Sequence, residues 1–406
     1  MIRYDASWVV PISEPPLKDG WVTVEGQQVV ACGPRAQKDR VDPTSQEIDL
    51  GHVAVLPGLV NAHTHLELSY LRDRIPAGGG FVAWIRRLLA ERRQLADSSA
   101  AEVVDAVHDA VAEATRSGTA LVGDISNTLV TVAELRPTSL AALVFYELLG
   151  FKAANPVELV DRARERLARV EPNGRVRVSL AAHAPYSVAP SLFRQIRLRA
   201  DQDLSQPYSV HLAESDEEVQ FVRSGRGPWR ELLEELGVWD PAWIAPGVSP
   251  VQYLADIGFL GPRTLAVHAV QATTADLATL AACDTTLVTC PRSNARTGAG
   301  VPPIEAFYRS GTRVAVGTDS LASTPDLNLF SELAEMHALA PSVPARLLLE
   351  SATRHGALAL GFDEYGTIEP GRCARLIAVD IPRGTDDVEE YLMSGVQPEQ
   401  VRWIGE

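Results

Sequence analysis

The segment 57-PGLVNAHTHLELS-69 carries two histidines, His63 and His65, directly after an apolar run that begins at residue 53. Side chains at alternate positions of a β-strand point to the same side, so both imidazoles are expected to enter one space. Imidazole is a good ligand for zinc and its neighbours among the transition metals. The pair alone is a weak pattern. At the carboxyl end of the first strand of an α/β barrel it becomes a strong one, because barrel enzymes carry their sites at that end.

Eight apolar runs recur along the chain from this segment onward, and helical patterns separate them. Segments between the runs, such as 99–118 and 156–170, place apolar residues at i, i+3, i+4 and i+7, which is typical of amphipathic helices. Near-continuous apolar strands joined by helices predict a parallel sheet buried on both faces. Eight such units favour a closed (β/α)8 TIM barrel of the α/β class over an open sheet. The runs are 53–60, 119–125, 140–146, 176–182, 207–212, 264–269, 284–290 and 312–318.

The two ends of the chain have a different character, with short strand-like runs broken by Gly, Pro and Asp. We therefore predict a small β-sandwich domain assembled from residues 1–55 and 362–406, around a barrel of residues 56–361. One connection, 213–263, is unusually long and contains three Trp. Long insertions on this side of a barrel are usually lids or specificity loops, and an additional packing helix is the alternative.

The composition disfavours several classes of protein. The 406 residues carry a formal net charge of −15, and an acidic surface repels phosphates, so no nucleic-acid polymer is expected as a partner. The four cysteines form no CxxC pair, which argues against a disulfide framework or a thiolate zinc site and fits a reducing cytoplasm. No signal-peptide pattern opens the chain and no apolar run approaches about 18 residues, so we expect a cytoplasmic protein without a membrane segment.

Further polar side chains follow other apolar runs. His183, His211 and His268 lie at the ends of the fourth, fifth and sixth runs, and Asp319 follows the eighth. One such histidine could be a core residue with satisfied hydrogen bonds. Five histidines and an aspartate at the same end of parallel strands are hard to explain by packing alone. The other four histidines are expected in structural or surface positions: His52, His108, His337 and His355.

Taken together, these motifs resemble the amidohydrolase superfamily, and within it the branch of mononuclear metal-dependent deaminases. The resemblance covers nearly the whole chain, and it implies that Glu214 shuttles protons and that His268 lies beside the metal-bound water. The metal ligands that it implies, for one divalent ion, are His63, His65, His211 and Asp319. The motifs that carry it are the HxH pair, 211-HLAE-214, the sixth-run histidine, 317-GTDS-320 and 366-GTIEPGRCARLIAVD-380.

The chemistry of this ligand set agrees with the implied activity. Three neutral nitrogens and one carboxylate leave a dication partly uncompensated and one coordination position open, where the pKa of bound water can fall to about 7. Attack by this metal-bound hydroxide would release ammonia, with Asp319 taking the water's proton, Glu214 protonating the ring nitrogen and then the leaving amine, and His268 steadying the developing charge. Zn2+ is the expected metal, and the same ligands also suit Fe2+, Ni2+ or Mn2+. A lysine-bridged binuclear centre is disfavoured, because no lysine ends the fourth run.

Within the branch, the chain most resembles aminodeoxyfutalosine deaminases, which hydrolyse a 6-aminopurine nucleoside on a menaquinone route. The resembling stretches are 63–72, 145–151, 211–215, 249–254, 290–294 and 317–323. The side chains expected to contact such a substrate are Glu67, Arg72, His183, Arg292 and Asn294, with Ser293 between the last two. Arg292 and Asn294 could equally cap the loop in which they lie. The stretch after them, 295-ARTGAG-300, departs from the longer glycine-bearing tail often found in the family, which leaves the contacts there open.

Several alternatives stay open. Guanine or cytosine deamination, S-adenosylhomocysteine deamination and hydrolytic dechlorination of triazines use the same ligands. A non-catalytic binding relative is a further alternative, although such relatives typically lose metal ligands that are present here. The expected partners are a small-molecule amine and water, and the resemblance implies a homodimer, because relatives are often dimers.

Overall fold

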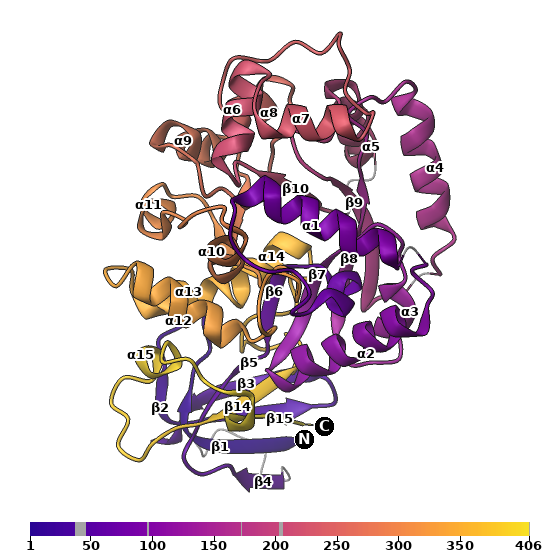
Figure 1. Ribbon diagram of the computed structural model, residues 1–406. Helices are drawn as coiled ribbons and strands as arrows, with labels where there is room; N and C mark the ends of the chain where they lie inside the picture. The colour runs from indigo at the N-terminus through magenta and orange to yellow at the C-terminus, as the bar shows by residue number, and fades with distance from the viewer. Residues whose placement is uncertain (37–45, 96, 172, 203–205, 406) are drawn as a thin grey trace.

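Eight parallel strands form the barrel at the centre of the molecule (Figure 1). The computed structural model describes residues 1–36, 46–95, 97–171, 173–202 and 206–405. Each barrel strand pairs in parallel with the next one along the chain, and an isolated bridge between Thr64 and Asp319 brings the last strand back to the first. The predicted (β/α)8 barrel is thus confirmed. Its strands are β6 (Leu59–Thr64), β7 (Thr119–Ser126), β8 (Ala141–Leu148), β9 (Val176–Ala182), β10 (Tyr208–Leu212), β11 (Thr264–His268), β12 (Thr286–Thr289) and β13 (Val314–Val316).

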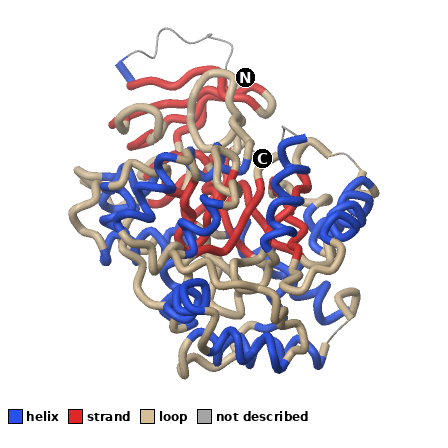
Figure 2. Tube along the Cα trace, turned by 90° about the horizontal axis from the view of Figure 1, so that it is seen from above, coloured by secondary structure: helices blue, strands red, loops and turns tan. Residues whose placement is uncertain are grey.

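Helices surround these strands, so that the strands are buried on both faces (Figure 2). All eight residues of β7 and all five of β10 are buried. Caps define where several helices begin: Asn155 accepts a hydrogen bond from the Glu158 N–H before α4, and Thr273 forms a capping box with Asp276 at α9. The helices are α1 (Phe81–Gln94), α2 (Ala101–Arg116), α3 (Thr131–Leu135), α4 (Pro156–Ala168), α5 (Pro190–Gln202), α9 (Thr274–Ala282), α10 (Pro291–Thr297), α11 (Ile304–Arg309), α12 (Leu329–Leu339), α13 (Ala345–Ser351) and α14 (Arg354–Leu360).

Both ends of the chain meet in a second sheet, which lies beside the barrel in Figure 1. Its strands come from the first 57 residues and from the last part of the chain, as predicted, and they hydrogen-bond into one mixed sheet. Apolar side chains such as Val22, Val55 and Leu376 form its own core. The domain boundaries at 55/56 and 361/362 remain our prediction. The strands are β1 (Ile2–Val9), β2 (Leu17–Glu25), β3 (Gln28–Pro34), β4 (Gln46–Asp49), β5 (Val53–Pro57), β14 (Leu376–Asp380) and β15 (Val401–Ile404), with the short helix α15 (Val388–Leu392) between the last two.

One sequence-based expectation about the strands was wrong. The run 53–60 was predicted as a single barrel strand, but it divides at Gly58 into β5 of the terminal sheet and β6 of the barrel. The Gly58 N–H donates to the carbonyl of Arg375, whereas the next N–H, of Leu59, donates to Gly118. A Cβ at position 58 would lie 2.6 Å from the Cβ of Ala120. Glycine therefore lets the chain pass from the terminal sheet to the barrel at this crowded position.

The insertion 213–263 forms three helices, α6 (Asp216–Ser224), α7 (Pro228–Glu235) and α8 (Pro250–Asp256). Aromatic contacts attach it to the barrel. Trp229 stacks on Tyr186 at 3.5 Å between ring centroids, and Trp239 stacks on Phe151 at 5.5 Å. The insertion is thus a packed element, and its role as a lid or specificity loop remains a prediction. Separately, no helix in the described part of the chain is both long and apolar enough to cross a membrane.

Candidate metal centre

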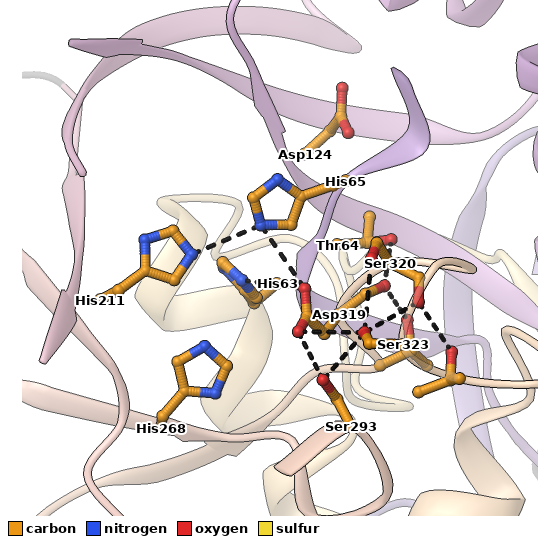
Figure 3. Close-up of polar contacts among 12 residues, drawn as sticks. His63, Thr64, His65, Asp124, His211, His268, Ser293, Asp319, Ser320 and Ser323 are labelled. Carbon is orange, nitrogen blue, oxygen red and sulfur yellow. Dashed lines mark hydrogen bonds and ion pairs between the residues drawn. The ribbon is translucent and has the colours of Figure 1, made fainter. Parts of the chain in front are cut away.

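Four side chains from three strand ends converge at the mouth of the barrel (Figure 3). His63 lies near the end of β6, His65 directly follows this strand, His211 lies on β10, and Asp319 follows β13. The ring centroid of His63 lies 5.0 Å from those of both His65 and His211. Asp319 Oδ1 lies 3.5 Å from His65 Nε2 and 3.8 Å from His63 Nε2. The structure therefore brings together all four side chains that the sequence suggested as ligands.

The electrostatics of this cluster fit a bound cation. His63 is 1% exposed, and both of its ring nitrogens are buried without a hydrogen-bond partner. Burial lowers the pKa of His63 well below its usual range and lowers that of His65 to about 3, so both rings are neutral and offer lone pairs at pH 7. A buried nitrogen without a partner is costly unless something binds it. One divalent cation beside Asp319 would bind the unprotonated nitrogen of each of these rings and balance the carboxylate.

Hydrogen bonds from neighbouring groups orient the candidate ligands. His211 Nδ1 donates to the carbonyl of His183 at 3.0 Å, which leaves Nε2 free to face the cluster. Asp319 Oδ2 accepts hydrogen bonds from Ser293 Oγ at 2.5 Å and from Ser323 Oγ at 3.2 Å. With Oδ2 held in this way, Oδ1 is the oxygen that faces the histidines.

The backbone is left-handed at several non-glycine residues around the centre. Ala213, His268, Ala269 and Asp319 have φ values of 51°, 77°, 49° and 62°. They follow or end β10, β11 and β13, where the chain turns out of the barrel. Each such conformation costs about 1–3 kcal/mol and persists only where the surrounding structure fixes it. The turns determine the direction in which His268 and Asp319 project.

Glu214 and His268 form a second pair beside the cluster. Both are buried, and Glu214 Oε1 lies 3.5 Å from His268 Nε2. Burial raises the pKa of Glu214 well above its usual range, and the carboxylates of Asp319 and Glu218 raise it further. A carboxyl group tuned in this way can hold and release a proton near neutral pH. On the other side of the His268 ring, Asn294 Nδ2 lies 3.0 Å from Nδ1.

Among the residues expected to contact a substrate, His183 lies beside His211. Its ring centroid is 5.0 Å from that of His211, and Ser187 Oγ lies 2.6 Å from its Nδ1. Glu67 is also buried, but both of its oxygens have partners. Oε1 accepts from the N–H of Asn127, and Oε2 accepts from the hydroxyls of Ser126 and Thr128.

The two arginines also have partners within the chain. Arg72 pairs with Glu113 at 2.5 Å and lines a surface cavity of about 580 Å³ whose lining residues include none of the four candidate ligands. Arg292 pairs with Asp326 at 2.9 Å and lies 3.7 Å from Glu332. Both arginines thus pair with carboxylates of the chain, and substrate contact by either of them remains a prediction.

Sequence reasoning did not single out two polar residues of the centre. Ser323 holds Asp319, and Glu147 Oε1 lies 3.5 Å from His211 Nδ1. Glu147 lies near the end of β8, one residue before its last position. A buried carboxylate at the end of an apolar run was the same signal that revealed the histidines, so this residue could have been found.

Comparison with known proteins agrees with this geometry. Residues 54–399 match the model of the amidohydrolase family. The aminodeoxyfutalosine deaminase of Deinococcus radiodurans is 33% identical over 84% of this chain and 81% of its own length. A 5-methylthioadenosine/S-adenosylhomocysteine deaminase of Syntrophobacter fumaroxidans is 32% identical over 89% of this chain and 80% of its own length.

A solved structure gives the same result. The crystal structure of an adenosine deaminase from Xanthomonas campestris with bound zinc is 29% identical, with a TM-score of 0.84 over 98% of this chain and 90% of that one. The similarity therefore extends through both sheets and the barrel mouth. The chain belongs to the amidohydrolase family and is a metal-dependent hydrolase of non-peptide carbon–nitrogen bonds with deaminases as its relatives.

Proposed function

We propose that this enzyme is a zinc-dependent deaminase of 6-aminopurine nucleosides, with aminodeoxyfutalosine as its first candidate substrate. We further propose that the cation is held by His63, His65, His211 and Asp319. The observation that carries the proposal is the placement of Glu214, a buried carboxyl group with a raised pKa, beside this neutral histidine cluster. Binding of a cation alone does not need such a group, whereas deamination requires a group that gives and takes protons.

The side chains divide the reaction between them. When bound, a divalent cation supplies Lewis-acid chemistry that makes water a nucleophile near neutral pH. Asp319 accepts a proton from this water through the carboxylate that Ser293 and Ser323 hold. Glu214 delivers a proton to the ring nitrogen next to the reacting carbon, regains a proton from the hydroxyl group added to that carbon, and passes it to the departing amine. The carbon–oxygen bond forms, the carbon–nitrogen bond breaks, and ammonia and the 6-oxo product leave.

The choice of substrate is supported by what the relatives have in common. Aminodeoxyfutalosine, 5-methylthioadenosine, S-adenosylhomocysteine and adenosine all contain a 6-aminopurine ring. The relative named for aminodeoxyfutalosine is slightly more identical to this chain than the one named for 5-methylthioadenosine and S-adenosylhomocysteine. 5-Methylthioadenosine and S-adenosylhomocysteine are therefore the next candidate substrates.

A panel of compounds tests the proposal. Purified zinc-loaded enzyme is given aminodeoxyfutalosine, 5-methylthioadenosine, S-adenosylhomocysteine, adenosine, guanine and cytosine, and ammonia release is measured together with the ultraviolet shift of the ring. We expect the highest kcat/KM with aminodeoxyfutalosine. A higher value for another nucleoside would move the assignment to that compound. Chloride release from a triazine, with no ammonia from any amine, would contradict the deaminase proposal.

A further inference from the structure

We propose that Asn294 is a positioning residue that keeps the proton of His268 on Nε2 and so keeps this histidine from becoming a metal ligand. The catalytic role of Asn294 rests on the proposed function, but its hydrogen bond to His268 does not depend on the identity of the substrate. It gives Asn294, which was expected to contact the substrate, a different task.

A hydrogen bond joins the side chains of Asn294 and His268. Asn294 is fully buried on α10, and its Nδ2 lies 3.0 Å from His268 Nδ1. The amide nitrogen can only donate, so Nδ1 must accept. A neutral imidazole carries one proton on its two nitrogens, and that proton must then lie on Nε2.

His268 lies close to the candidate ligands. Ligand-capable atoms of His63, His211 and His268 lie within 4.8 Å of one another, the same limit that encloses His63, His65 and Asp319. Figure 3 shows the His268 ring facing His63 and His211. By position alone His268 could therefore bind the same cation. A nitrogen that carries a proton has no free lone pair in the ring plane, so Nε2–H prevents this.

The protonated Nε2 of His268 can donate a hydrogen bond instead of binding a metal. His268 Nε2 lies 3.5 Å from Oε1 of Glu214, the carboxyl group that we propose transfers protons. An N–H there donates to the oxygen on which negative charge develops. Asn294 thereby decides between two roles for one ring, a hydrogen-bond donor to the reacting atoms or an additional ligand.

Both partners are held in place by their backbones. His268 adopts a left-handed conformation, and the N–H of the next residue, Ala269, donates to the carbonyl of Leu212 on the neighbouring strand. The Asn294 carbonyl accepts from the Ala299 N–H at the end of α10. The amide and the ring therefore meet at a fixed distance, which a relay of this kind requires.

The direct test is the position of the proton. Full-length, zinc-loaded protein is labelled with 15N-histidine, and the His268 ring signals are identified as those missing from His268→Gln. We expect the wild-type ring to carry its proton on Nε2. In Asn294→Asp the carboxylate can only accept, so the proton should move to Nδ1. A proton on Nδ1 in the wild-type enzyme would overturn the proposal, and this measurement stands even if the variant does not fold.

The second test separates positioning from a general structural role. In Asn294→Asp the free lone pair on Nε2 should join the ligand shell, so zinc affinity rises while kcat falls about 100- to 1000-fold with little change in KM. Substitution with Co2+ should show the additional ligand in the visible spectrum. Asn328→Asp, at another buried asparagine, controls for burial of a carboxyl group. Parallel loss of zinc affinity and activity in Asn294→Asp would mean a structural role only.

The outcomes distinguish this proposal from the proposed function. If the enzyme deaminates none of the nucleosides but His268 carries its proton on Nε2, the function fails and the role of Asn294 stands. If a nucleoside is deaminated and the proton lies on Nδ1, the function stands and the role of Asn294 fails.

Discussion

The mouth of the barrel buries polar side chains, whereas the terminal sheet buries apolar ones. Around the mouth, buried histidines and carboxylates crowd together. In the terminal sheet, Val22, Val55, Leu376 and Ala378 are fully buried among other apolar residues. Burying polar groups at the mouth costs folding stability but provides groups that can bind a metal and transfer protons. Burying apolar groups in the terminal sheet only stabilises the fold. The comparison teaches that damage to each region should appear in a different measurement.

The largest effect is expected at the mouth. His211→Gln removes one of the proposed nitrogen ligands, so zinc content should fall below one ion per chain and kcat/KM should fall by about 10,000-fold or more. Metal analysis and ammonia release measure the two quantities. His108→Gln, whose side chain is 70% exposed, is the matched control and should change neither. Full zinc content in His211→Gln would contradict the prediction, because zinc binding would then not need His211.

A second substitution at the mouth should separate proton transfer from metal binding. Glu214→Gln keeps the shape of the side chain but cannot carry a proton, so kcat should fall by about 100- to 10,000-fold while the zinc content stays the same. The half-buried neighbour Glu217 provides the control Glu217→Gln. If Glu214→Gln loses zinc as well, Glu214 would be part of the ligand set and our assignment of its role would be wrong.

The terminal sheet should respond in the opposite way. Leu376→Ala creates a cavity in the apolar core, so the free energy of unfolding should fall by about 2–5 kcal/mol, as urea denaturation would show. At a temperature where the variant remains folded, its kcat should match the wild type. Leu358→Ala, at a position 38% exposed, should be nearly neutral. A large fall in kcat for folded Leu376→Ala would show that the two regions are coupled.

The smallest effect concerns a histidine outside the metal centre. His355 donates from Nδ1 to the carbonyl of Val314 at the start of β13, and burial lowers its pKa. The folded state therefore disfavours the charged form, so the stability from this residue is present above about pH 6.5 and is lost as the pH falls through the lowered pKa. The free energy of unfolding of zinc-loaded His355→Gln should thus fall less steeply than that of the wild type between pH 7 and pH 5. An equal or steeper fall would contradict this assignment.

The sequence was sufficient for the barrel and for the convergence of its polar strand ends. Apolar runs are local signals, and the carboxyl ends of parallel strands must meet at one face, so His63, His211 and Asp319 could be placed together without coordinates. The division at Gly58 could not be predicted, because the run 53–60 reads as continuously apolar. Which sheet each half joins depends on β14, more than 300 residues later.

Hydrogen bonds between side chains far apart in the chain could not be predicted from the sequence either. Glu67 was expected to face a nucleoside, but three residues at the end of β7 and just after it use both of its oxygens. Asn294 read equally well as a substrate contact or a loop cap, and the structure pairs it with His268. Hydrogen bonds of this kind depend on side-chain directions at several turns, which no local pattern specifies.

The pairing of Val53 on β5 with Asp380 on β14 has a consequence for synthesis on the ribosome. The strands made first cannot complete their sheet until almost the entire polypeptide has emerged, because β14 lies between β5 and β15 in the strand order. Contacts this distant along the chain slow folding. During translation the edge of β5 is an unprotected strand edge, so a product released before β14 should be prone to aggregation even though every residue of the metal centre has already been made.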